Sequence, residues 1–265
     1  MAFRTLSSRV IASSVLAALA AGGTYGFLVH RRISATDASK ITIFDTTPDS
    51  FQQSLSVSEI VNARKHQQVE DSRFITLEIP PQHQHITDEV LLARFAKGYF
   101  GGLVLSPERI LLKAIGLNLT KFTTIENQAT VARFWSTKDL SDHKLPPLHS
   151  VLYGVFQVLD IKLPQKNDTK SQQGSTESYI DFGFGRDQRQ FVGVHRFSVV
   201  RPNDRPPTGQ RTVQIHRQSM TCNPTVNRPV GPGFLYHFHN IYAQLLFREA
   251  VAEVSVALNQ VPEGV

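Results

Sequence analysis

The second half of this 265-residue chain alternates strand-like segments with turns and then ends in one long helical segment. Aromatic and β-branched residues dominate five stretches, which polar or proline-rich turns separate: 122–135, 150–163, 177–185, 190–200 and 211–222. Residues 233–259 instead repeat apolar side chains at helical spacing. A sheet with one apolar face must bury that face, so we predict an α+β fold in which a curved antiparallel sheet wraps around a long C-terminal helix.

The part of the chain before these strands has a less regular pattern. Strand composition is present at 41–44 and 73–79. Two helices are predicted between residues 87 and 116, because Thr87 is a good helix cap and Ser106 precedes a proline that suits the first helical position. We expect their wide apolar faces to cover the sheet or an apolar cavity.

Residues 10–29, VIASSVLAALAAGGTYGFLV, contain no charged side chain. At 1.5 Å per residue this stretch reaches about 30 Å, which is the thickness of the hydrocarbon core of a bilayer. We therefore predict a short basic N-terminus (1–9), a transmembrane helix (10–29), a linker (30–40) and a single α+β domain (41–265). Basic residues on both sides of the helix leave its orientation open.

Two other interpretations of this leader remain open. Its first nine residues carry arginine and serine without an acid, as mitochondrial presequences do, and Ala18-Leu19-Ala20 resembles the cleavage triplet of a signal peptide. The expected location is a membrane of the secretory pathway or of the mitochondrion, crossed once.

Charge and cysteine content exclude several classes. The net charge is +6, but residues 41–265 carry 23 basic and 21 acidic side chains, so no nucleic-acid partner is expected. The single cysteine, Cys222, excludes an internal disulfide and is expected to be a small buried residue. We expect no metal or other cofactor, because no P-loop, dinucleotide fingerprint or zinc motif is present.

The strands FGFG (182–185) and GVHRF (193–197) face each other across a turn, and another strand and the long helix follow them. This order resembles the closing half of the START-like, helix-grip superfamily of the SRPBCC type, in an uncharacterised branch, over residues 120–260. The resemblance implies a helix-grip fold with an apolar cavity between the sheet and the C-terminal helix.

The hairpin at 179–200 predicts one aromatic face. If it turns at residues 186–189, Phe184 pairs with Phe191, and Ile180 lies opposite His195. We expect the ligand-binding side chains to come from this face and from the terminal helix: Ile180, Phe182, Phe184, Phe191, Phe197, Phe238 and Tyr242.

Two histidines are candidate catalytic residues. A second turn at residues 206–207 would place His195 opposite His216 within the apolar face. Burial could tune such imidazoles for proton transfer or for orienting a ligand. The alternative is that they are ordinary core histidines.

These features lead to one leading functional hypothesis and two alternatives. We predict a membrane-anchored protein that binds a hydrophobic small molecule, such as a lipid or a polyketide- or terpenoid-like metabolite, so that its partners are the bilayer and this molecule. The alternatives are a cyclase, dehydratase or isomerase of secondary metabolism with a histidine base, and a structural or assembly protein of a mitochondrial or endoplasmic-reticulum membrane. If the body is lumenal, the sequons at Asn118 and Asn167 predict glycosylation.

Overall fold

One curved, mostly antiparallel sheet contains the eight strands of the described residues in a computed structural model. In chain order the strands are β1 (Thr42–Phe44), β2 (Gln68–Ile79), β3 (Arg133–Phe134), β4 (Val151–Leu152), β5 (Phe156–Lys162), β6 (Thr176–Gly185), β7 (Val192–Arg201) and β8 (Arg211–Cys222). They lie side by side in the order β1-β2-β8-β7-β6-β5-β4-β3, with only β3 and β4 parallel among these pairs. The first long strand, β2, is therefore the neighbour of the last strand, β8.

The structure describes residues 2–125, 132–164, 176–202, 211–231 and 233–260. Within these ranges, the side chains of residues 2–13, 15–18, 176 and 233–237 are not described.

Five α-helices accompany the sheet in the described part of the chain. They are α1 (Ala2–Ile33), α2 (Asp49–Gln52), α3 (Asp88–Gly101), α4 (Ser106–Ile115) and α5 (Gly233–Asn259). The two helices predicted between residues 87 and 116 are confirmed, and the Thr87 hydroxyl accepts a hydrogen bond from the Val90 amide at 3.3 Å. The predicted α+β class and the packing of the C-terminal helix on the sheet are also confirmed.

Two predicted strands differ from the structure. Residues Thr123–Ile125 form a short 3₁₀ turn, and residues 126–131 of the same predicted strand lie outside the described residues. The predicted strand at 150–163 is divided into β4 and β5 by Tyr153 and Gly154, which have φ angles of 52° and 69°. A left-handed backbone cannot continue a strand, so the chain reverses at this point.

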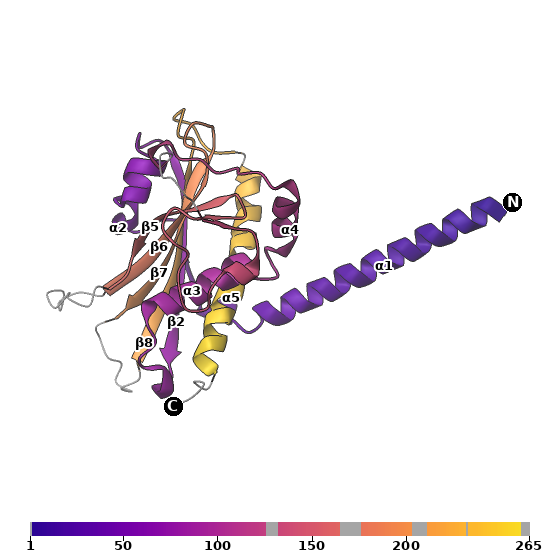
Figure 1. Cartoon of the computed structure of the whole chain (residues 1–265), viewed down its shortest axis with the longest axis horizontal. Helices are drawn as coiled ribbons and strands as arrows, with labels where there is room; N and C mark the ends of the chain where they lie inside the picture. The colour runs from indigo at the N-terminus through magenta and orange to yellow at the C-terminus, as the bar shows by residue number, and fades with distance from the viewer. Residues whose placement is uncertain (1, 126–131, 165–175, 203–210, 232, 261–265) are drawn as a thin grey trace.

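Helices α3 and α5 cover one face of the sheet, which we call the helix face (Figure 1). Gly98 allows their close approach, because a Cβ atom there would lie 2.8 Å from Ala250 Cα. The opposite face is covered by residues 49–61 and 120–125, which bury a second apolar cluster. This cluster contains Cys222, as expected for the single cysteine.

Helix α1 spans the whole segment predicted to cross a membrane and extends away from the body (Figure 1). Its last turns contact the body: Tyr25 donates a hydrogen bond to the Leu103 carbonyl at 2.5 Å, and Arg32 pairs with Glu253 of α5. Among the residues that could be searched, no helix is both apolar and long enough to cross a bilayer. Side chains 10–13 and 15–18 of the predicted span lie outside the described part.

Candidate functional site

The two predicted catalytic histidines lie on opposite faces of the sheet. In the β6–β7 hairpin His195 pairs with Phe182 and not with Ile180, the predicted partner. This shift of two residues keeps His195 on the helix face, as predicted. In the β7–β8 pair His195 lies opposite Ser219, and His216 lies opposite Ser198. The prediction that His195 faces His216 is therefore wrong. The observed register of β7 and β8 differs from the predicted one by three residues, because His195 lies opposite Ser219 and not opposite His216. An odd difference in register places the side chains of one strand on the other face of the sheet.

His216 belongs to the face opposite the helices. Its ring stacks on Phe74 with 4.8 Å between the centroids, and its Nε2 lies 3.1 Å from the Gln214 side-chain oxygen. Burial lowers the pKa of His216 to about 4. It is thus a neutral packing residue at neutral pH.

Aromatic side chains from α3 and α5 fill the space next to β6 and β7. Phe95 lies 4.9 Å from Phe197 between ring centroids, Phe100 lies 4.8 Å from Phe182, and all four rings are buried. The predicted ligand-binding residues Ile180, Phe182 and Phe197 are part of this core.

The other predicted ligand-binding residues differ in burial. Phe184 is also buried and packs on His195 with 4.6 Å between the ring centroids, whereas Phe191, just before β7, is half exposed. On α5, Phe238 is 68% exposed and stacks on Tyr242. Phe238 and Tyr242 lie on the side of α5 toward α4, because Tyr242 bonds to Glu108 of that helix.

The helix face also carries a group of buried polar side chains, which we call the arginine cluster. The register pairs Arg73 of β2 with Arg217 of β8, and it pairs Ser219 with both Asp71 and His195. Helix α5 adds Gln244 and His239. The cluster consists of Asp71, Arg73, His195, Arg217, Ser219, His239 and Gln244.

One carboxylate in this cluster accepts hydrogen bonds from two guanidinium groups. Oδ2 of Asp71 accepts hydrogen bonds from both Arg73, at 2.5 Å, and Arg217. Arg73 also donates to the Gln244 side-chain oxygen at 3.1 Å. Of the described side chains, Asp71 is the one carboxylate that pairs with either arginine, so a net positive charge is buried here.

The protonation states follow from burial and from neighbouring charges. Burial alone would raise the pKa of Asp71, but Arg217 and Arg73 outweigh it and hold that pKa below its ordinary value. Burial, and then the charge of Arg217, lower the pKa of His195 well below its ordinary value. The imidazole is therefore neutral at neutral pH.

The neutral His195 has a defined tautomer. A guanidinium group can only donate, and Nη2 of Arg217 lies 3.2 Å from Nδ1 of His195. Nδ1 is therefore the acceptor, and Nε2 carries the proton. With its acceptor nitrogen facing a cation, His195 is a poor general base, which weighs against the catalytic hypothesis.

Both arginines retain an unused donor. The Nε atoms of Arg73 and Arg217 are buried and have no hydrogen-bond partner. Such groups cost roughly 1–3 kcal/mol each when they are left unsatisfied. The cluster thus combines excess positive charge with free donors, the chemistry that suits an anionic group.

The opposite face of the sheet buries a different arginine. Arg196 donates to both oxygens of Asp181, at 2.7 and 2.8 Å, and its guanidinium lies over the rings of Tyr179 and Phe51. Burial would lower the pKa of Arg196, but the hydrogen bond to Asp181 and the charge of that carboxylate raise it. This pair is matched one to one.

Sequence patterns did not indicate Asp71, Arg73 or Arg217 as site residues. The only local signal was that Arg73 and Arg217 alternate with strand-forming residues. What makes them a site is that β2 and β8 are neighbours, although Asp71 and Arg217 are 146 residues apart.

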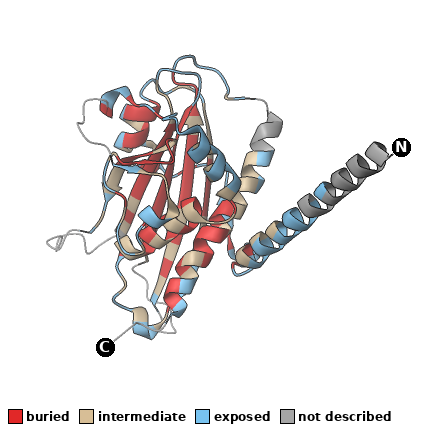
Figure 2. Ribbon diagram, turned by 45° about the vertical axis from the view of Figure 1, so that its right-hand side comes forward, coloured by how far each residue is buried: buried red, intermediate tan, exposed pale blue. Residues whose placement is uncertain are grey.

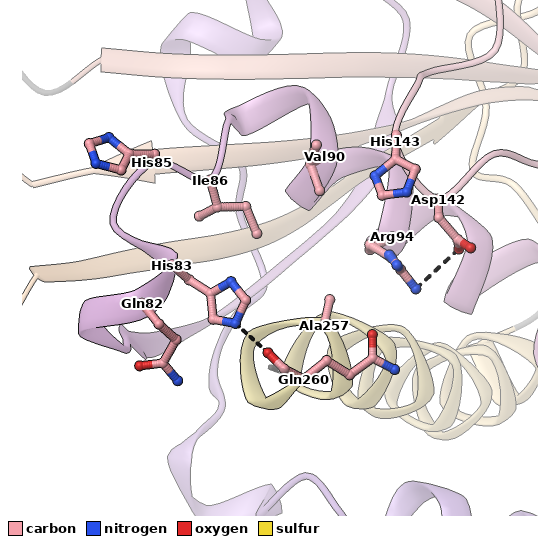
Figure 3. Close-up of a pocket in the computed structure, with 10 residues that line it drawn as sticks. All are labelled: Gln82, His83, His85, Ile86, Val90, Arg94, Asp142, His143, Ala257 and Gln260. Carbon is pink, nitrogen blue, oxygen red and sulfur yellow. Dashed lines mark hydrogen bonds and ion pairs between the residues drawn. The ribbon is translucent and has the colours of Figure 1, made fainter. Parts of the chain in front are cut away.

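A surface hollow of about 830 Å³ is a second candidate (Figure 3). It lies where the start of α3 meets the end of α5, and His83, His143 and the Arg94–Asp142 ion pair line it. Nε2 of His83 is already 2.6 Å from the Gln260 carbonyl. Among the described residues, no three metal-binding side chains are grouped for an ion.

The two predicted glycosylation sites differ in their setting. Asn118 is exposed, but Thr120 of the same sequon is buried and donates to the Gly185 carbonyl at 3.1 Å. Asn167 lies outside the described residues.

Comparison with known proteins gave no relative. No protein-family model, no curated protein and no solved structure matches the chain.

Proposed function

We propose that this protein is a membrane-anchored helix-grip domain that binds a hydrophobic small molecule between the sheet and the N-terminal half of α5. The neighbouring position of β2 and β8, and the long terminal helix packed on the sheet, support the helix-grip part of the proposal. The aromatic layer at β6 and β7 is filled, so the ligand is assigned to the other end of the interface.

The observation that carries this proposal is the change of burial along α5 (Figure 2). Ala250 and Val254 in its second half are buried, whereas Phe238 and Ile241 near its start are 68% and 52% exposed. Large apolar side chains next to each other on a surface favour an apolar partner. Phe238 and Ile241 lie on the side of α5 away from the sheet, but His239, which shares the sheet-facing side with Ala250 and Val254, has a side chain that is 43% exposed. The first turns of α5 therefore cover the sheet incompletely, and a ligand could fill the remaining gap.

A second apolar surface supports attachment to a bilayer. Ile110 and Leu111 of α4 and Phe27 of α1 are all more than half exposed. Figure 1 shows α1 leaving the body on the side of α4, and Tyr242 of α5 bonds to Glu108 of α4. A membrane at this side would cover these residues, and the exposed Arg31 at the end of α1 would suit anionic head groups.

Photo-crosslinking tests the ligand site directly. The full chain in lipid nanodiscs is irradiated with a long-chain alcohol that carries a diazirine, and the labelled peptides are mapped by mass spectrometry. We expect saturable labelling of residues 238–245 and of β2 or β8, reduced at least several-fold by Phe238→Ser with Ile241→Ser. Leu148→Ser, at an exposed leucine elsewhere, is the control. Labelling confined to α1 and α4, without saturation, would contradict a bound ligand.

An assembly role is the second candidate, and the filled aromatic layer favours it. If α4 docks on another membrane protein, replacing Ile110 and Leu111 with serine should shift the full chain from a larger complex to a smaller one on native gels. An unchanged complex would exclude α4 as the docking surface.

A further inference from the structure

We propose that the arginine cluster binds an anionic group, a carboxylate or a phosphate, at the polar end of the bound molecule. This inference rests on the proposed function for the apolar part of the ligand. It assigns the ligand to the class of anionic amphiphiles, such as fatty acids or lipids with a phosphate head.

The charges within the arginine cluster do not balance. The two buried guanidinium groups of Arg73 and Arg217 face one carboxylate, that of Asp71. A buried ion without a counter-ion is strongly destabilising. Asp181 and Arg196 show that the same sheet can bury an arginine with full compensation. A bound anion would give the arginine cluster the same balance.

The hydrogen-bond donors of the two arginines are also incompletely used. Asp71 uses terminal nitrogens of both arginines, and the Nε atoms remain unpaired and buried. A guanidinium group presents its donors in a planar fork that fits carboxylate and phosphate oxygens. An anion beside these forks would satisfy donors that no described protein group reaches.

The arginine cluster lies close to solvent on the side of α5. Gln244 bonds to Arg73, and the ring of His239, one turn earlier on α5, lies 4.0 Å from Asp71. The side chain of His239 is 43% exposed, so the cluster lies just beneath the point where α5 becomes open to solvent. The exposed Phe238 and Ile241 are neighbours of this opening along the helix. A head group at the arginines would therefore place its tail at the incompletely covered end of α5.

A comparison of three probes tests the inference with the full chain in detergent at pH 8. The probes are oleate, oleyl alcohol and inorganic phosphate, and binding is measured by calorimetry. We expect oleate to bind at least 10-fold more tightly than oleyl alcohol. Arg73→Met should weaken oleate 10- to 100-fold and leave the alcohol unchanged, and Arg64→Met, at an exposed arginine on the opposite side, should change neither.

The outcomes separate this inference from the proposed function. Equal binding of oleate and the alcohol, with no effect of Arg73→Met, would overturn the anionic head group and leave hydrophobic binding in place. Binding of phosphate alone, lost in Arg73→Met, would support the anion site and contradict the hydrophobic ligand. Binding of none of the three probes would overturn both.

The comparison between oleate and its alcohol is made in the unmodified chain, so the test does not depend on how well a variant folds. Arg217→Met serves as a second variant. We expect it to weaken oleate at least 10-fold, and unchanged oleate binding in both arginine variants would count against the site.

Discussion

The two faces of the central sheet each bury arginine and aspartate, but they balance them differently. On the face opposite the helices, Asp181 and Arg196 form a bidentate pair between aromatic rings. On the helix face, Asp71 is shared by Arg73 and Arg217, and both Nε atoms are unpaired. The first arrangement is complete by itself, so it needs no partner beyond the fold. The second is incomplete, which is why we assign binding to it.

The largest expected effect comes from removing the shared carboxylate. Asp71→Asn would leave two buried guanidinium groups without a counter-ion, and we expect the free energy of unfolding to fall by about 5 kcal/mol. Urea titration followed by the fluorescence of Trp135 would measure this, with the exposed Asp45→Asn as control. A loss below about 1 kcal/mol would mean that the two faces do not differ as described.

The matched pair should be nearly as sensitive to the loss of one partner. Arg196→Met leaves Asp181 buried without its cation, and we expect a loss of about 3 to 4 kcal/mol in the same titration. Combining it with Asp181→Leu should recover most of this stability, because both charges are then removed. A double variant as unstable as the single one would show that packing, and not charge balance, dominates this face.

The lowered pKa values of His216 and His195 predict that the free energy of unfolding falls at acidic pH. The pKa of His216 is about 4 in the folded chain and about 6.5 as an ordinary value, so the unfolded chain binds more protons between these values. Stability from this group is complete above pH 6.5 and is lost as pH falls toward 4, by about 3 kcal/mol. His216→Phe, which keeps the stack on Phe74, should flatten this part of the pH profile. If the unfolding free energy of this variant still falls to the same extent at low pH, other groups, including His195, cause the loss.

The smallest effect is expected for Arg73→Met. It leaves Asp71 and Arg217 as a one-to-one pair, so the unfolding free energy should change by less than about 1 kcal/mol although a fully buried side chain is replaced. Comparing the unfolding free energies of Arg73→Met and Arg196→Met is the most direct test of the difference between the two faces. A loss of about 3 kcal/mol or more would mean that the second arginine is structural.

Local patterns in the sequence were sufficient for the elements that depend on local chemistry. The cap at Thr87 and the apolar spacing behind it predicted α3, and the terminal periodicity predicted α5. The hairpin of β6 and β7 was predicted with the correct faces, because an even error in register does not move side chains across the sheet.

Long-range relations were beyond these patterns. The pairing of β7 with β8 depends on a connection whose length does not set the register, and an odd error separated His195 from His216. The apolar face of α3 was recognised, but not that Phe95 and Phe100 would occupy the space expected for a ligand. The arginine cluster required the neighbouring position of β2 and β8, which nothing near Asp71 in the sequence indicates.

Cys222 can report on the opening of the layer that covers one face of the sheet. It ends β8, pairs in register with Gln68 of β2 and Val192 of β7, and its thiol is shielded beside the Val61 carbonyl. Burial raises the pKa of this thiol to about 11, so alkylating reagents can reach a reactive form only when residues 49–61 lift from this face or the strands separate. The rate of alkylation of a single native thiol therefore measures how often the face that carries Asp181 and Arg196 is uncovered.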